Sequence, residues 1–231
     1  MNHSIKSFIM YPRILGKMLT INDLKISNFV SDMQSIRSKV SVLIIDDEPF
    51  VYLNRLRDAH FHICQHSVYE DVYSVAEYPI VICDIKGVGT QINSEKEGAY
   101  VAKEIKTTYP YKQVVVYSGN AYKVDSLDLE GIHTIKKDSD FDSWSDYIEE
   151  MIKKVTDPKE CWIRIRELLL SKEITTKDIS FLEHEYVDIF NNHPEDMKYF
   201  PNSRKSVKLG EDVKSIINSM IAGGLLALLG L

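Results

Sequence analysis

The stretch Val40-Ser-Val-Leu-Ile-Ile-Asp-Asp-Glu-Pro49 joins an apolar run directly to three acidic residues. Aliphatic, β-branched runs of this length are typical of strands buried on both faces of a parallel sheet. Four further apolar runs follow at residues 61–64, 79–83, 113–117 and 132–135. Since helix-length polar segments separate the runs, the pattern predicts an α/β domain with a doubly wound, five-stranded parallel sheet.

The rest of the chain divides around this sheet. Thr156-Asp-Pro158 predicts a boundary, because proline is common at the first turn of a new helix. We therefore expect an N-terminal extension with a short helix (1–39), the sheet domain (40–157) and a smaller all-α region with an apolar tail (158–231). Apolar spacing predicts individual helices at residues 21–38, 95–108, 141–155, 162–170, 176–190 and 207–229.

Composition limits the possible functions. The 231 residues include 28 Lys and Arg against 34 Asp and Glu, so the net charge is 28 − 34 = −6. A mildly acidic chain does not resemble proteins that coat nucleic acid through a basic surface. The three cysteines form no close pair, which favours a reducing cytoplasmic location.

Polar residues follow the predicted strands where each one ends. Asp46-Asp-Glu48 follows the first strand, Asp84 the third and Ser118 the fourth, and Lys136-Lys137 follows the fifth. The carboxyl ends of parallel strands meet at one edge of a sheet, so these groups should converge there. Carboxylates held close together repel one another unless a cation offsets them, and Mg²⁺ prefers such oxygen ligands. A carboxylate at a magnesium site can act as a nucleophile toward phosphorus.

Four motifs at these strand ends resemble, in order, those of the receiver domains of two-component response regulators, the CheY-like family. They are residues 43–49, 81–85, 115–119 and 135–136. The resemblance implies a flavodoxin-like receiver fold with Asp84 as the phosphoacceptor. It also implies that Mg²⁺ is bound by Asp47 directly, by Asp46 through water, by Asp84 and by the backbone carbonyl of Lys86.

The same resemblance gives roles to four other residues. Ser118 would donate to a phosphoryl oxygen, Lys136 would pair with the phosphate, and Asn120 would tune dephosphorylation. His133 stands at the position of the family's switch aromatic, and Lys137 stands where the family usually has proline. The loop from residue 84 to 98 is longer than in the family, and the segment from 118 to 136 is shorter.

Three hypotheses follow. The leading one is a response-regulator-like signalling protein, phosphorylated by a histidine kinase, a phosphorelay or a small phosphodonor, that switches its helical module without being a conventional enzyme. A second is a pseudo-receiver that acts as an interaction module without phosphorylation. The third is a receiver-controlled effector that acts at membranes through residues 215–231. We expect that tail to pack on the chain or on a partner, including a second copy, since it is shorter than a membrane span.

Overall fold

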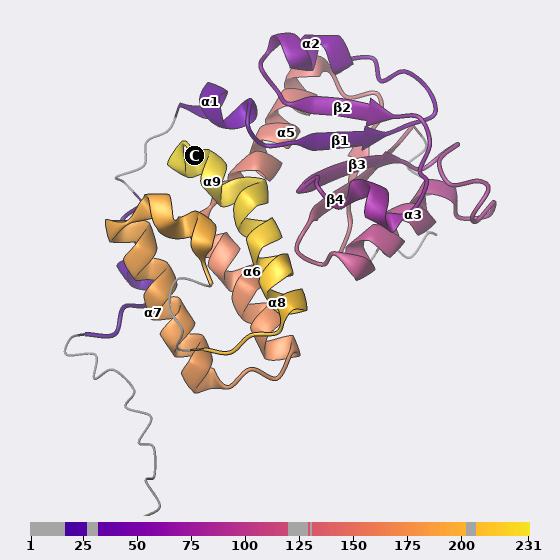
Figure 1. Ribbon diagram of the computed structural model, residues 1–231. Helices are drawn as coiled ribbons and strands as arrows, with labels where there is room; N and C mark the ends of the chain where they lie inside the picture. Colours follow the sequence, from indigo (N-terminus) through magenta and orange to yellow (C-terminus); the bar gives the residue numbers. More distant parts are fainter. Residues whose placement is uncertain (1–16, 27–31, 120–128, 130, 202–206) are drawn as a thin grey trace, which may run out of the picture.

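The computed structural model describes residues 17–26, 32–119, 129, 131–201 and 207–231 (Figure 1). It confirms an α/β fold in which five parallel strands form one sheet, followed by a helical C-terminal region, consistent with a flavodoxin-like receiver fold. The strand order is β2-β1-β3-β4-β5. The strands are β1 (Val42–Ile45), β2 (Ile63–His66), β3 (Ile80–Asp84), β4 (Gln113–Ser118) and β5 (His133–Lys136).

Helices cover both faces of the sheet. On one face, α1 (Met33–Arg37), α2 (Leu53–Asp58) and α5 (Phe141–Thr156) enclose one buried cluster. On the other face, the 3-10 helix η3 (Val72–Val75) and α3 (Glu97–Thr108) enclose a second. Because successive strand residues alternate between faces, both clusters draw on every central strand. Both faces of the central strands are therefore lined by buried apolar residues, and the polar residues of β3 and β4 stand at the strand ends.

The N-terminal extension differs from the expected single helix over residues 21–38. A 3-10 helix, η1 (Ile21–Asp23), ends at Leu24, whose ψ of 131° is extended. The backbone N–H of Ile21 donates to Glu183 at 2.8 Å, which ties this segment to the C-terminal region. Helix α1 instead packs on the sheet core through Ile36. One amphipathic pattern thus contributes to two hydrophobic cores. The boundary between the N-terminal extension and the sheet domain at residue 39 stays a prediction.

The C-terminal region is helical and has its own buried core. Asp157 ends α5 and its side chain caps the following helix, which begins at Pro158. The elements are α6 (Pro158–Ser171), α7 (Thr176–Asn192), the 3-10 helix η4 (Pro194–Tyr199), α8 (Glu211–Met220), the π-helical turn η5 (Ile221–Leu225) and α9 (Leu226–Leu229). Trp162 and Tyr186 pack together in this core, with their ring centroids 5.3 Å apart.

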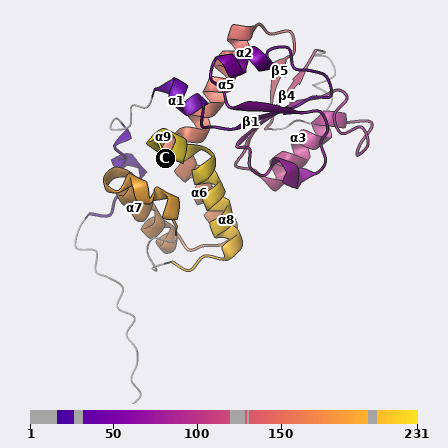
Figure 2. The same ribbon diagram turned by 45° about the horizontal axis from the view of Figure 1, so that its top comes forward.

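The apolar tail returns to the sheet domain. A Cβ atom on Gly224 would overlap the carbonyl oxygen of Val155, so the turn lies directly against the end of α5. Ala227 then joins the same buried cluster as α5, and α9 lies beside α1 in both views (Figures 1 and 2). The helix Glu211–Leu229 is long and apolar enough to cross a membrane by length and composition, which is weak evidence when taken alone.

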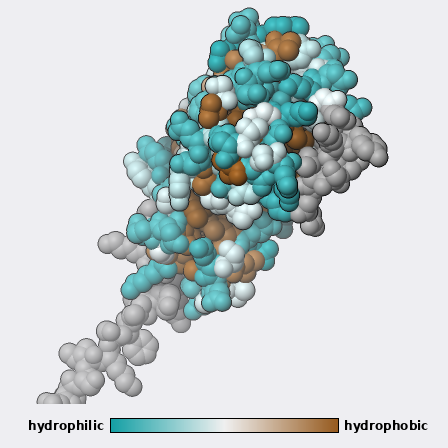
Figure 3. All heavy atoms as spheres, turned by 90° about the vertical axis from the view of Figure 1, so that its right-hand side faces the viewer, coloured by the Kyte–Doolittle hydropathy of each residue, from teal (hydrophilic) through white to brown (hydrophobic). Residues whose placement is uncertain are grey.

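Hydrophobic residues are unevenly distributed over the side of the molecule at the right of Figure 1. Figure 3 shows that its upper part is mainly hydrophilic, with scattered apolar residues, and that apolar residues gather lower down. The lower part belongs to the helical C-terminal region, which contains the apolar tail of residues 215–231.

Candidate functional site

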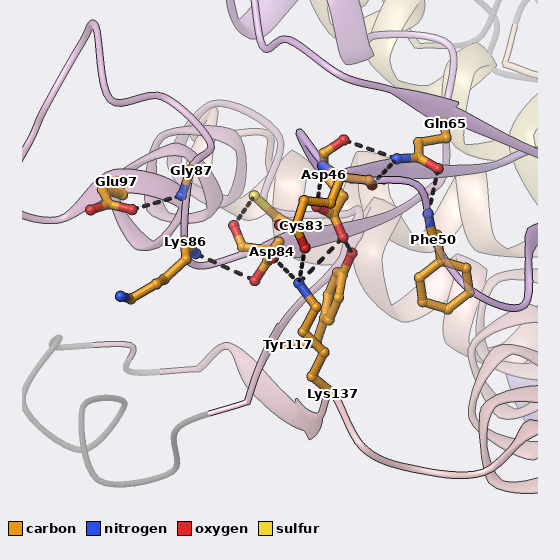
Figure 4. A network of polar contacts seen from close by, with 11 residues as sticks. Asp46, Phe50, Gln65, Cys83, Asp84, Lys86, Gly87, Glu97, Tyr117 and Lys137 are labelled. Carbon is orange, nitrogen blue, oxygen red and sulfur yellow. Dashed lines mark hydrogen bonds and ion pairs between the residues drawn. The ribbon is translucent and has the colours of Figure 1, made fainter.

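Strand alternation brings four polar side chains to the α5 side of the sheet. Ile44, Ile82, Val115 and Ile135 are the buried residues of β1, β3, β4 and β5 that contribute to the core on that side. Two residues further along each strand come Asp46, Asp84, Tyr117 and Lys137. Because the side-chain period of a strand is two, these four residues follow the same face and meet at the carboxyl edge. Figure 4 shows them converging.

Three carboxylates form the centre of this site. Asp46, Asp47 and Asp84 each offer an oxygen, and these oxygens lie within 4.8 Å of one another. Asp46 and Asp84 are buried, while Asp47 is exposed. Backbone donors orient the buried pair: the N–H of Glu48 donates to Oδ1 of Asp46 at 2.9 Å, and the N–H of Lys86 donates to Oδ1 of Asp84 at 3.3 Å. Both bonds come from the loops that follow the strands.

The ammonium group at the carboxylates belongs to Lys137 and not to Lys136. Nζ of Lys137 lies 2.5 Å from Oδ2 of Asp84 and 3.7 Å from Oδ2 of Asp46. Lys136 is exposed and is paired in register with Ser118 on the neighbouring strand. The expectation for Lys136 thus differs from the structure by one residue, which moves a side chain to the opposite face of the strand.

Burial and charge shift the pKa values in this group. Burial raises the pKa of Asp84, and the Asp46 carboxylate raises it further, while the hydrogen bond and charge of Lys137 act in the opposite direction. Burial lowers the pKa of Lys137, but the hydrogen bond and charge of Asp84, with the charges of Asp46 and Glu48, outweigh it, so the pKa is raised. Lys137 therefore stays protonated beside a carboxyl group that is costly to ionise.

The structure adds two site residues that the sequence patterns did not single out. Tyr117 is fully buried and its hydroxyl donates to Oδ2 of Asp46. Gln65, on β2, donates from Nε2 to the carbonyl oxygens of Asp46 at 2.9 Å and Glu48 at 2.6 Å, and so fixes the loop after β1. The sequence feature that could have indicated Tyr117 is its hydroxyl group at the end of an apolar run. The signal for Gln65 was a polar residue following Cys64.

The loop after β3 leaves room for the exposed carboxylate of Asp47. Gly87 has a φ of +83°, and a Cβ atom there would overlap the carboxylate of Asp47. The backbone N–H of Gly87 donates to Glu97 at 2.7 Å, which holds the loop against the start of α3. Three carboxylates, converging and left with net negative charge beside one lysine, fit a hard divalent cation such as Mg²⁺.

The other expected site residues lie around this group or outside it. Ser118 ends β4 and is half-buried, and its backbone carbonyl oxygen accepts the backbone N–H of Lys137 at 3.1 Å. His133 is exposed on β5, with its ring 6.5 Å from that of Tyr147 on α5. Asn120 lies outside the described residues.

Comparison with known proteins gives one structural likeness. No protein-family model matches the chain, and no curated protein matches it. Full-length FixJ from B. japonicum, among solved structures, is 12% identical over 84% of this chain and 98% of its own, with a TM-score of 0.41. A likeness at this identity and TM-score assigns neither a family nor an activity.

Proposed function

We propose that this chain is a response-regulator-like signalling protein in which Asp84 accepts a phosphoryl group at a magnesium site. The observation that carries the proposal is the convergence of three carboxylates within 4.8 Å, with the ammonium of Lys137 at 2.5 Å from Asp84. Asp47 would bind the cation directly and Asp46 through water, Asp84 would add the third carboxylate, and the carbonyl of Lys86 would add a backbone ligand. The proposal uses Lys137 in the role that the motif alone gave to Lys136.

The chemistry needs little more than positioning. An oxygen of Asp84 forms a bond to phosphorus while the bond between phosphorus and the donor's leaving atom breaks, and the leaving group keeps that electron pair. When bound, Mg²⁺ would offset the charge of the carboxylates and of the phosphoryl oxygens. Lys137, already at Asp84, remains protonated and pairs with the phosphoryl group. Ser118 lies one residue beyond Tyr117, the register partner of Asp84, so its side chain follows the opposite face of β4 and would turn toward Asp84 to donate to the same group.

Intact mass measurement tests this proposal. The protein is incubated with a small acyl phosphate, with Mg²⁺ or with a chelator. We expect one acid-labile phosphoryl group per chain, only with Mg²⁺, and none on an Asp84→Asn variant. Asp138→Asn is the matched control, because Asp138 also follows a strand but does not belong to the group of three converging carboxylates among the described residues. Equal labelling of Asp84→Asn would refute Asp84 as the acceptor.

A second candidate is a pseudo-receiver that works as an interaction module without phosphorylation. The favouring observation is that Asp84 and Asp46 already have partners, Lys137 and Tyr117. This candidate would be favoured if the chain bound no divalent cation and gained no phosphoryl group from any phosphodonor.

The output we propose is a change at the helical C-terminal region. Its partners would be a histidine kinase or another phosphodonor and a protein that contacts the helices, and self-phosphorylation and self-dephosphorylation are the only catalysis assigned. We place the protein in the cytoplasm. Action at a membrane would require Ala227 and Leu225 to leave their buried positions.

A further inference from the structure

We propose that Tyr117 is a positioning residue that fixes the carboxylate of Asp46 for cation binding and passes occupancy of the acidic site to α5 through Trp144. This inference rests on the function proposed above, since it assigns a relay to the same site. Tyr117 is a strand residue on the α5 side of the sheet, and the motif comparison gave it no role.

The first part of the relay is the hold on Asp46. Its Oδ2 accepts from the Tyr117 hydroxyl and its Oδ1 accepts from the N–H of Glu48, so both oxygens are oriented. Asp46 is 1% exposed and Tyr117 is fully buried, so water does not replace either donor readily. Nζ of Lys137 lies 5.5 Å from the centre of the Tyr117 ring. A cation that draws Asp46 toward Asp47 and Asp84 must therefore displace the tyrosine hydroxyl or carry it along.

The second part is a triangle of aromatic rings. The ring of Tyr117 lies 5.4 Å from Trp144 and 5.9 Å from Phe50, and Phe50 lies 5.0 Å from Trp144, all edge to face. Close-packed rings of this kind do not move independently, because a shift of one leaves a void or a clash at the next. Movement of Tyr117 therefore reaches Trp144.

The third part is helix α5. Trp144 lies in its first turn and is fully buried. The indole Nε1 has no hydrogen-bond partner among the described residues, so packing alone sets its position. At the other end of α5, the carbonyl of Val155 touches Gly224 of the C-terminal turn. One helix thus joins the aromatic triangle to the helical region.

Tryptophan fluorescence tests the relay, because the chain has only two tryptophans. A Trp162→Phe background leaves Trp144 as the sole reporter. Cation affinity is measured separately by Mn²⁺ paramagnetic resonance. We expect Trp144 emission to change as the site fills, and Tyr117→Phe to weaken cation affinity about tenfold, as for other residues that orient a metal ligand. At saturating cation the same variant should lose most of the emission change.

Tyr69→Phe is the matched control. Tyr69 is a buried tyrosine whose hydroxyl also donates to a carboxylate, that of Glu104 at 2.8 Å, but on the α3 side of the sheet. This variant should keep both the affinity and the emission change. A further variant, Phe50→Leu, leaves the Tyr117 hydroxyl and Asp46 intact. It should keep the cation affinity and reduce the change in Trp144 emission. It also tests the relay if Tyr117→Phe does not fold.

The outcomes separate the two proposals. If the unaltered protein binds no divalent cation, the proposed function and the relay both fail. If it binds the cation while Tyr117→Phe or Phe50→Leu gives the same Trp144 response as the background, only the relay is overturned.

Discussion

The two ends of the parallel sheet each hold a lysine, and their surroundings are opposite. At the amino end, Lys112 is buried, and its Nζ donates to the backbone carbonyls of Ala76 and Tyr78 at 2.7 Å each. Burial lowers the pKa of Lys112 to about 8. At the carboxyl end, Lys137 meets Asp84 and Asp46, and its pKa is raised.

This difference shows what makes a lysine part of a functional site. Neutral carbonyls satisfy the donors of Lys112 but do not offset the cost of burying its charge. Lys112 lines a small cavity together with Pro79 and Gly223, at the contact with the C-terminal helix. We infer that the amino end is a structural junction, whereas the carboxyl end brings three carboxylates and an ammonium group together, charges that a ligand could rearrange.

The largest effect should come from the junction. Gly224→Ala would drive a Cβ atom into the carbonyl oxygen of Val155, a backbone atom that cannot move aside cheaply. We expect the free energy of unfolding to fall by about 3 kcal/mol, the upper part of the range for overpacking. Urea unfolding followed by circular dichroism measures it. Gly223→Ala is the control: its Cβ meets only the side chain of Pro79, at 3.2 Å, and stability should hardly change.

Lys112 should make stability depend on pH in the alkaline range. Its folded pKa of about 8 lies below the ordinary 10.5, so between these values the unfolded chain binds a proton that the folded chain does not. The free energy of unfolding of the unaltered protein, minus that of Lys112→Met, should therefore rise with pH across this window. The total rise is at most about 3 kcal/mol, at about 1.4 kcal/mol per pKa unit. A flat difference for Lys112→Met would contradict the assignment.

The two adjacent lysines after β5 should behave differently. Without Mg²⁺, Lys137→Met leaves Asp84 and Asp46 close together with no cation, and we expect a loss of about 2 kcal/mol. Lys136→Met should stay within about 0.5 kcal/mol of the unaltered protein, as for most exposed positions. Added Mg²⁺ should restore part of the Lys137→Met loss. Equal losses in the two variants would show that Lys137 is not the site lysine.

The smallest effect concerns Asp84 itself. Its raised folded pKa means that its contribution is most favourable below the ordinary value of 3.8 and is lost as pH rises through the raised pKa. At pH 7 Asp84→Asn should therefore be more stable than the unaltered protein, by less than the Lys137→Met loss. Unfolding at several pH values should show this advantage shrinking as the medium becomes more acidic. An advantage that grows on acidification would mean that the Asp84 pKa is lowered.

Sequence patterns predicted the sheet and its acids well, for a physical reason. An apolar run that changes abruptly to aspartate marks where a buried strand reaches solvent, and this placed Asp46 and Asp84 at one edge. The pattern could not indicate that Lys137 and not Lys136 lies beside these acids, because the two lysines are chemically identical neighbours. Only the burial of Ile135 shows which of them follows the face of the acids.

Other features depended on packing that no local pattern contains. In the run Val114–Tyr117 every residue is buried, so apolar content could not indicate which side chain faces α5. The spacing over residues 21–38 fits one helix, but its described apolar residues pack in two separate cores, those of 21–26 in one and those of 33–36 in the other. In both cases the strand register and the packing partner, rather than local propensity, determine where each side chain lies.

The position of Ala227 affects how the protein is made. Residues 227 and 228 complete the hydrophobic cluster around α5, yet they follow α5 by the whole length of the helical region. A ribosome synthesises the sheet and α5 first, so the nascent domain exposes an apolar gap until the last turns emerge. We therefore expect the sheet domain to gain its full stability only after α9 has been synthesised and has packed against α5.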